Sequence, residues 1–293
     1  MTMTVNLVLT LVSRDADAVR LAAGVPGGIG AVSDRSGGGW RVAERVVGGE
    51  AELAAWLEAE SPAAGLDWAI TPAANRRKRL LISDMDSTII GQECLDELAD
   101  FAGLKAEVSA ITERAMRGEL DFAGALTQRV AMLKGLKLEA LAACHEQRVR
   151  LNPGAKELVA TMKAHGARCV LVSGGFRYFT SRVAAMAGFD ADRANTLVDD
   201  GAALTGAVGM PILGREAKLT ALLEETAALG LTAGDAVALG DGANDLDMIR
   251  AAGLGIAYKA KPIVAAETRA RIQYTDLRAA LFFQGYGVNE IIA

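Results

Sequence analysis

Apolar and polar residues alternate along this chain in blocks that predict strands interleaved with helices. Leu80 to Ile82 is a short apolar run that follows basic residues, which is typical of a buried parallel strand. Runs of the same kind at Ala167 to Val172, Ala236 to Leu239 and Leu254 to Ala257 predict three more strands. Helical spacing lies between and after them, over Pro153–His165 (with Asn152 as N-cap), Arg177–Ala187, Arg215–Leu229, Leu246–Ala251 and Leu277–Gln284. This alternation predicts a doubly wound parallel sheet.

The first 75 residues have a different pattern, with elements in the order β-α-β-β-α-β. The predicted strands and helices are Val5–Val12, Asp15–Ala23 (with Asp15 as N-cap), Ile29–Val32, Trp40–Val47, Glu50–Glu60 and Leu66–Ile70. This order is that of a ferredoxin-like α+β domain. The polar segment from Thr71 to Lys78 is typical of an interdomain linker. We expect its basic triplet, Arg76 to Lys78, to be solvated.

Between Gln92 and Arg150 the spacing of apolar residues is helical throughout. Four helices are predicted, over Glu93–Phe101, Lys105–Arg117, Asp121–Leu133 and Leu138–Arg150. One crossover helix is enough to join two parallel strands, so this block is longer than the connection requires. It is either a cap inserted over an active site or an ordinary helical layer on the sheet.

Composition limits the choice of function. The 293 residues are 51% hydrophobic and 23% charged, which allows two domains or one large domain with an insertion. The net charge of −5 and the absence of a basic stripe argue against a nucleic-acid partner. No apolar run has membrane-spanning length, and Cys94, Cys144 and Cys169 show no CxxC spacing. We therefore expect a reduced, cytoplasmic protein without membrane or nucleic-acid partners, with a homodimer as a possible assembly.

Asp84 and Asp86 lie where the first apolar run should end. Open α/β sheets bind ligands at the carboxyl ends of their strands. In extended backbone, residues two apart point to the same side, so these carboxylates would share one crevice. Two close anions are unfavourable unless one is protonated or a cation lies between them. The pair therefore predicts acid–base chemistry, a metal site, or both.

Other polar residues fall at or next to strand ends. Ser173 and two glycines follow the second strand, where N–H groups at a helix start can hold an anion. Lys218 supplies a fixed positive charge, and the third strand ends in Asp241, Asn244 and Asp245. Carboxylates beside anion-binding groups indicate Mg²⁺ and phosphate. Each residue also has an ordinary alternative, as a turn residue or as surface charge.

The motifs DMDST, LVSGG and GDGAND occur in that order, with Lys218 between the last two. This set resembles the haloacid dehalogenase (HAD) superfamily of phosphotransferases, and the resemblance spans Leu80 to Ile256. Within that superfamily the chain resembles the phosphoserine phosphatases, because of Gly91-Gln92-Glu93, the stretch from Met116 to Phe122, and Arg129.

The resemblance implies a Mg²⁺-dependent phosphomonoester hydrolase that converts O-phospho-L-serine to L-serine and phosphate, the last step of serine biosynthesis. Asp84 would attack phosphorus and become an aspartyl phosphate, and Asp86 would act as general acid and base. The implied metal-binding residues are Asp84, Asp86 and Asp241, with Asp245 in support. The implied substrate-binding residues are Ser173, Gly174, Lys218 and Asn244 for the phosphoryl group, Glu93 for the ammonium and Arg129 for the carboxylate.

The same resemblance sets the expected domains. Residues 1–75 resemble, in element order, the ACT-like N-terminal region of longer phosphoserine phosphatases, with a regulatory or dimerising role. Residues 76–293 would form the HAD-like phosphatase domain, with the helical cap at about 92–150. A second enzymatic hypothesis is action on another small phosphomonoester, or phosphoryl transfer to homoserine. A phosphoamino-acid sensor on an inactive scaffold is disfavoured, since Asp84, Asp86, Lys218 and Asp241 are all present.

Overall fold

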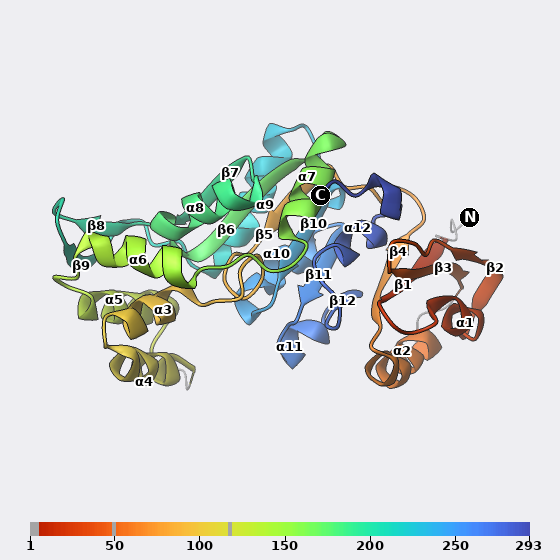
Figure 1. Cartoon of the computed structure of the whole chain (residues 1–293), viewed down its shortest axis with the longest axis horizontal. Helices are drawn as coiled ribbons and strands as arrows, with labels where there is room; N and C mark the ends of the chain where they lie inside the picture. Colours follow the sequence, from red (N-terminus) through yellow and green to blue (C-terminus); the bar gives the residue numbers. More distant parts are fainter. Residues whose placement is uncertain (1–5, 49–50, 117–118) are drawn as a thin grey trace. The chain divides into compact units, whose positions relative to one another are not determined.

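The computed structural model describes residues 6–48, 51–116 and 119–293. Val5, Glu50, Arg117 and Gly118, which belong to stretches used in the sequence analysis, lie outside these ranges. The chain divides into two compact units, whose elements are labelled in Figure 1. The first unit is the described part of Met1–Ile82 with Pro153–Cys169 and Leu222–Ala293; the second is the described part of Ser83–Asn152 with Val170–Ala221.

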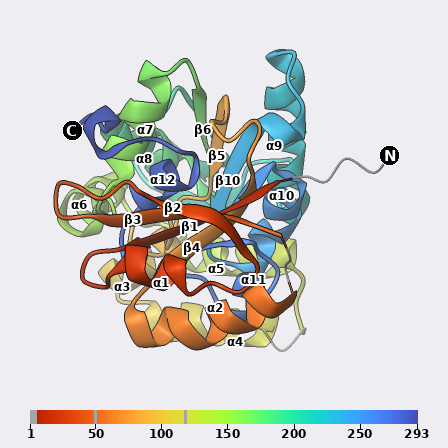
Figure 2. The same cartoon turned by 90° about the vertical axis from the view of Figure 1, so that its right-hand side faces the viewer.

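The N-terminal part of the first unit is an antiparallel sheet with two helices. Its elements are β1 (Leu7–Ser13), α1 (Ala18–Ala23), β2 (Gly28–Asp34), β3 (Arg41–Val47), α2 (Ala51–Ala64) and β4 (Asp67–Pro72). The strand order β2-β3-β1-β4 is the predicted ferredoxin-like arrangement. Both helices cover the same face of the sheet (Figure 2), where Leu53 and Leu57 pack with Leu9 and Leu11.

Two helices begin at other residues than the sequence indicates. The N-cap of α1 is Asp17 rather than Asp15, because the Asp17 carboxylate accepts a backbone N–H from the first turn at 3.0 Å. Helix α7 (Ala155–Ala164) is capped by Gly154, with a left-handed φ of 83°, rather than by Asn152. In both places several acceptable caps lie within a few residues, so local pattern alone does not select one.

The antiparallel sheet continues into a parallel one within the first unit. Strand β4 pairs with β12 (Ala270–Ile272), a short strand that the sequence analysis missed. The next strands in order are β11 (Leu254–Tyr258), β10 (Ala236–Gly240) and β5 (Leu80–Ser83). The β10–β11 and β11–β12 pairs are parallel. The remaining helices here are α10 (Leu246–Ala251), α11 (Pro262–Ala265), α12 (Ala279–Phe283) and the second half of α9 (Arg215–Ala228). The predicted α/β fold is confirmed.

Two basic residues of the predicted linker, Arg76 and Lys78, are packed rather than solvated, while Arg77 is exposed. Arg76 donates a hydrogen bond to Glu44 at 2.8 Å, with only 14% of its side chain exposed. Lys78 is buried, and its Nζ donates to the carbonyl of Gly234 at 2.8 Å. These partners are distant in sequence, which is why composition gave the wrong answer for Arg76 and Lys78. The proposed domain boundary near residue 75 stays a prediction.

The second unit contains the predicted helical block, most of β6 and the elements after β6 up to the first half of α9. The four helices of the block are α3 (Cys94–Phe101), α4 (Lys105–Met116), α5 (Phe122–Met132) and α6 (Leu138–Arg148). They are followed by β6 (Arg168–Phe176), α8 (Arg177–Ala187), the unpredicted strand β7 (Ala191–Asn195) and a hairpin of β8 (Leu197–Asp199) and β9 (Leu204–Val208). The N–H of Gly135 donates to Leu204 at 2.8 Å, so the hairpin is bonded to the loop after α5.

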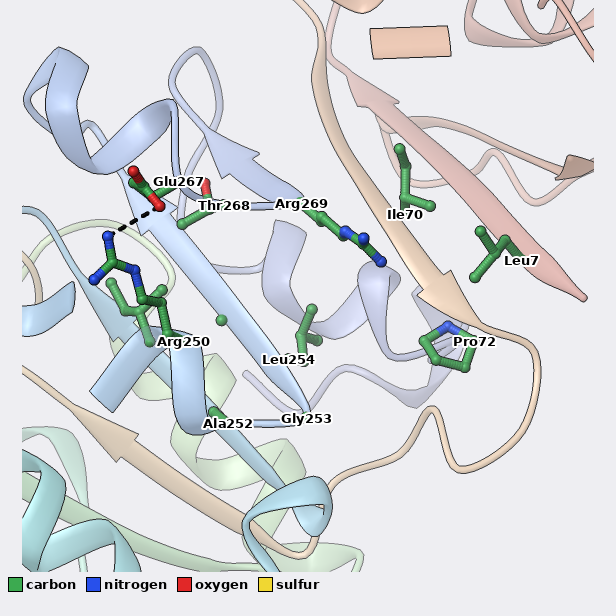
Figure 3. Close-up of a pocket in the computed structure, with 12 residues that line it drawn as sticks. Leu7, Ile70, Pro72, Arg250, Ala252, Gly253, Leu254, Glu267, Thr268 and Arg269 are labelled. Carbon is green, nitrogen blue, oxygen red and sulfur yellow. Dashed lines mark ion pairs between the residues drawn. The ribbon is translucent and has the colours of Figure 1, made fainter. Parts of the chain in front are cut away.

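A pocket of about 340 Å³ opens in the first unit, between the β1–β4 sheet and the start of β11 (Figure 3). Its rim carries an ion pair of 3.0 Å between Arg250 and Glu267, both about half exposed. Exposed ion pairs of this kind contribute little to stability. None of the predicted site residues lines this pocket. No helix in the described part of the chain combines the length and apolar character needed to cross a membrane.

Candidate active site

The two predicted catalytic aspartates follow β5, whose four residues are all buried. The strand ends at Ser83, and the carbonyl of Met85 then accepts the N–H groups of Thr88, Ile89 and Ile90 at 3.3, 2.9 and 3.0 Å. A tight turn therefore begins directly after Asp84. It places the carboxylates of Asp84 and Asp86 on a rigid strand end rather than on a long loop.

Asp84 forms a buried ion pair with Lys218. Lys218 Nζ lies 2.6 Å from Asp84 Oδ1, and the two side chains are 3% and 7% exposed. Lys218 comes from the first turn of α9. Removing one partner of such a pair leaves an uncompensated buried charge, so each group holds the other in its ionised form. A carboxylate kept ionised in this way can act as a nucleophile.

Asp86 has different surroundings. Its Oδ1 accepts the backbone N–H of Cys94 at 2.9 Å, and its Oδ2 accepts the hydroxyl of Ser173 at 3.1 Å. Burial raises the pKa of the Asp86 carboxyl, and these hydrogen bonds with the charge of Lys218 oppose that rise. A carboxyl group with a raised pKa is suited to donating and accepting a proton. Two aspartates two residues apart thus have different surroundings: Asp84 is paired with an ammonium, and Asp86 accepts two hydrogen bonds.

Ser173 and its glycines lie at the end of β6, which extends to Phe176 rather than ending before Ser173. The N–H of Gly175 donates to Ser173 Oγ at 2.8 Å. A Cβ on Gly175 would lie 3.0 Å from Ser173 Oγ and 3.1 Å from Asp86 Oδ2. Only glycine fits without displacing the serine–aspartate contact. Helix α8 begins directly afterwards, at Arg177.

The helical block supplies a pair of opposite charges. Glu93 is the N-cap residue of α3, and its Oε1 accepts the hydroxyl of Ser87 at 2.7 Å. Arg129 lies on α5, and its Nε donates to the carbonyl of Ala125 at 3.3 Å. Burial lowers the pKa of Arg129, while the charges of Asp96 and Glu93 oppose this shift. Glu93 and Arg129 are therefore within electrostatic range of each other, as an anion and a cation on the same helical block.

The GDGAND motif forms a loop after β10 in the first unit. Asp245 is fully buried, and its Oδ2 accepts the N–H groups of Asp241 and Gly242 at 3.2 and 3.0 Å. A Cβ on Gly240 would come within 2.4 Å of the Asp245 side chain, so glycine is required there. Asp245 therefore shapes the loop, whereas the side chain of Asn244 is exposed. The metal-binding roles that the sequence analysis gave to Asp241 and Asp245 stay predictions.

The structure adds residues that the sequence analysis did not select. Ser87 holds Glu93 and has a left-handed φ of 55°. Asn195 is buried and bonds to the main chain next to Ser173. Their signals in the sequence are weak, because a serine inside DMDST and a lone asparagine after an apolar residue are common. Cys94 contributes a backbone N–H, while burial raises the pKa of its thiol and keeps it protonated.

Comparisons with known proteins show the family to which this chain belongs. Residues 81–250, more than half of the chain, match the model of the haloacid dehalogenase-like hydrolases. A HAD family hydrolase from Salmonella enterica superposes with a TM-score of 0.86 at 29% identity, covering 94% of this chain and 98% of the other. The chain belongs to the haloacid dehalogenase-like hydrolase family.

Several relatives of this chain are phosphoserine phosphatases. The phosphoserine phosphatase of Polaromonas is 48% identical over 199 residues, which cover 66% of this chain and 84% of the relative. The structure of a probable phosphoserine phosphatase from Vibrio cholerae has a TM-score of 0.77 and 30% identity, covering 97% of this chain and 88% of that one.

Proposed function

We propose that this protein is a phosphoserine phosphatase, which hydrolyses O-phospho-L-serine to L-serine and phosphate through an aspartyl phosphate. The observation that carries the proposal is the second unit's combination of an ionised Asp84, a protonatable Asp86 and the charge pair of Glu93 and Arg129. The two aspartates provide for phosphoryl transfer. The charge pair is complementary to the ammonium and the carboxylate of an amino acid. Relatives that are named phosphoserine phosphatases support the same substrate.

In the first step an Asp84 oxygen attacks phosphorus, and the bond from phosphorus to the serine oxygen breaks. The protonated Asp86 gives its proton to that oxygen, so that serine leaves as an alcohol. In the second step Asp86, now ionised, takes a proton from water, and the resulting hydroxide attacks the aspartyl phosphate. Asp84 is released as a carboxylate, and Asp86 is again protonated. The raised pKa of Asp86 favours the form that the first step needs.

Lys218, Ser173, Gly174 and Asn244 bind the phosphoryl oxygens in this proposal. The ammonium of Lys218 is already 2.6 Å from the nucleophile, so it can stabilise negative charge on the transferring group. Ser173 stands between Asp86 and the Gly175 N–H, where its hydroxyl is held in one orientation. Positioned donors of this kind provide most of the catalysis in phosphoryl transfer.

A divalent metal belongs to the proposal, and we propose Mg²⁺. The carboxylates that the motifs supply for it are those of Asp84, Asp241 and Asp245. Carboxylate oxygens are the donors that a hard cation prefers, so the donor set fits Mg²⁺. Asp245 already uses one oxygen for two N–H groups, which makes it a supporting residue beside Asp84, Asp241 and the Asp86 backbone carbonyl. When bound, the ion reduces the repulsion between the anionic nucleophile and the phosphate.

Specificity for phosphoserine is assigned to Glu93 and Arg129. The substrate's ammonium would meet the Glu93 carboxylate, which Ser87 holds in place at 2.7 Å. Its carboxylate would meet the guanidinium of Arg129, whose planar donors suit bidentate binding. The pair therefore selects an amino acid over a simple alkyl phosphate.

A phosphate-release assay over a panel of phosphomonoesters with Mg²⁺ tests the whole proposal. Phosphoserine should be hydrolysed with the highest kcat/KM, and Asp84→Asn should abolish release with every substrate. Product analysis with homoserine present tests transfer to another alcohol, since phosphohomoserine would form only if the aspartyl phosphate is intercepted. A preference for a phosphomonoester without an amino acid moiety would refute the substrate assignment. The proposed compartment is the cytoplasm, in keeping with three buried cysteines that take part in no disulfide.

A further inference from the structure

Asn195 is a buried amide at the end of β7, with 2% of its surface exposed. Its Nδ2 donates to the carbonyls of Gly174 and Leu213 at 2.8 and 3.1 Å, and its Oδ1 accepts the N–H of Leu213 at 2.7 Å. Carbonyls only accept and an N–H only donates, so the orientation of this amide is fixed. The side chain therefore bonds two main-chain segments to each other.

Both segments belong to the active site. Gly174 follows Ser173, whose hydroxyl contacts Asp86. Leu213 lies two residues before the start of α9, and Lys218 stands in the first turn of that helix. Asn195 therefore sets the spacing between the serine–glycine turn and the helix that presents Lys218 to Asp84.

Strand pairing does not hold this turn. The parallel register of β6 with β7 pairs Val172 with Arg193 and then resumes only at Phe176 with Asn195. The ladder is irregular over Ser173 to Gly175, and Ser173 in this stretch contacts Asp86. Within this gap the Asn195 side chain provides the bond to the Gly174 carbonyl that a neighbouring strand would otherwise provide.

We propose that Asn195 is a positioning residue for phosphoryl transfer. It fixes the main chain at Gly174 and the start of α9, so that Ser173 and Lys218 approach the same phosphoryl group. The inference rests on the proposed function of this site as a phosphoryl-transfer centre, and it does not depend on the substrate being phosphoserine.

Two substitutions of Asn195 test this role. Asn195→Ala removes all three hydrogen bonds, whereas Asn195→Asp removes the two donors and keeps the acceptor for Leu213. Both should lower kcat by about ten- to a hundredfold, because small displacements of positioned groups have effects of this size. Orthovanadate, a phosphate-like inhibitor, should bind more weakly by a similar factor. If Asn195→Ala does not fold, Asn195→Ser replaces it, because its hydroxyl retains one donor.

A matched control separates positioning from stability. Thr180→Val removes the 2.7 Å hydrogen bond to Asp192, which is also on β7 but does not contact the serine–glycine turn. This variant should lower the melting temperature and leave kcat and vanadate affinity unchanged. An equal loss of kcat in Thr180→Val and Asn195→Ala, at equal loss of melting temperature, would overturn the positioning role.

The pH profile provides a signature that a structural role lacks. In Asn195→Asp the carboxyl group regains one donor when it is protonated, so its activity relative to wild type should rise as pH falls. The relative activity of Asn195→Ala should stay constant. A constant ratio in both variants would refute the inference. The series is run with both phosphoserine and p-nitrophenyl phosphate. If the substrate assignment is wrong, wild-type protein hydrolyses phosphoserine poorly but still hydrolyses p-nitrophenyl phosphate, so the role of Asn195 can be measured on that second substrate.

Discussion

The most informative perturbation of the proposed function is Arg129→Ala, measured on two substrates. Phosphoethanolamine shares the phosphate and the ammonium of phosphoserine but lacks the carboxylate. Arg129 is assigned to that carboxylate alone, so the substitution should affect only phosphoserine. The guanidinium is partly buried and lies near the charges of Glu93 and Asp96, so it is not an ordinary surface arginine.

The size of the effect follows from the type of contact. A hydrogen bond to a charged group contributes about 1.5–3 kcal/mol, and 1.4 kcal/mol corresponds to a factor of about ten. Arg129→Ala should therefore lower kcat/KM for phosphoserine by about ten- to a hundredfold. The value for phosphoethanolamine should change by less than about twofold, because the variant loses no contact with that substrate.

Initial rates of phosphate release at several substrate concentrations measure both values. Arg114→Ala is a matched control, since Arg114 lies on the neighbouring helix α4, is exposed and pairs with Glu119 at 3.3 Å. It removes the same charge from the helical block without touching Arg129, and both substrates should react as in the wild type. Equal losses on both substrates in Arg129→Ala would show that Arg129 supports the fold or the phosphate, and the reasoning would be refuted.

Three further predictions concern the chemistry. Asp84→Asn should abolish turnover while circular dichroism shows a folded protein, because an amide is a poor nucleophile; phosphate release near the wild-type rate would exclude the covalent mechanism. EDTA should remove activity and Mg²⁺ restore it, while Ca²⁺ should inhibit, since it accepts more ligands in a looser geometry; full activity in metal-free buffer would contradict this. Because burial raises the pKa of Asp86, the rate of phosphoenzyme formation should be maximal below that pKa and fall as pH rises through it. Rapid-quench measurements should show this decline in the wild type, and its persistence in Asp86→Asn would assign it to another group.

The sequence by itself determined the elements and the chemistry that is local in the chain. Helical spacing placed α3, α5, α6, α8 and α9 within a few residues of their observed bounds, because amphipathic periodicity is a property of consecutive residues. The same holds for Asp84 and Asp86, since a buried run followed by two aspartates defines the strand and its end. The motifs then indicated the family that the comparisons show.

Tertiary structure decided what depends on residues far apart in sequence. The short strand β12 exists because β4 and β11 flank it, and its three residues carry too little pattern to reveal it. Lys78 can be buried because the carbonyl of Gly234, 156 positions away, accepts a hydrogen bond from its Nζ. Asn195 gains its proposed role only when Gly174 and Leu213 meet it in the fold. Composition describes a residue's preference for water, whereas burial and hydrogen bonding depend on the partners that the folded chain brings to it.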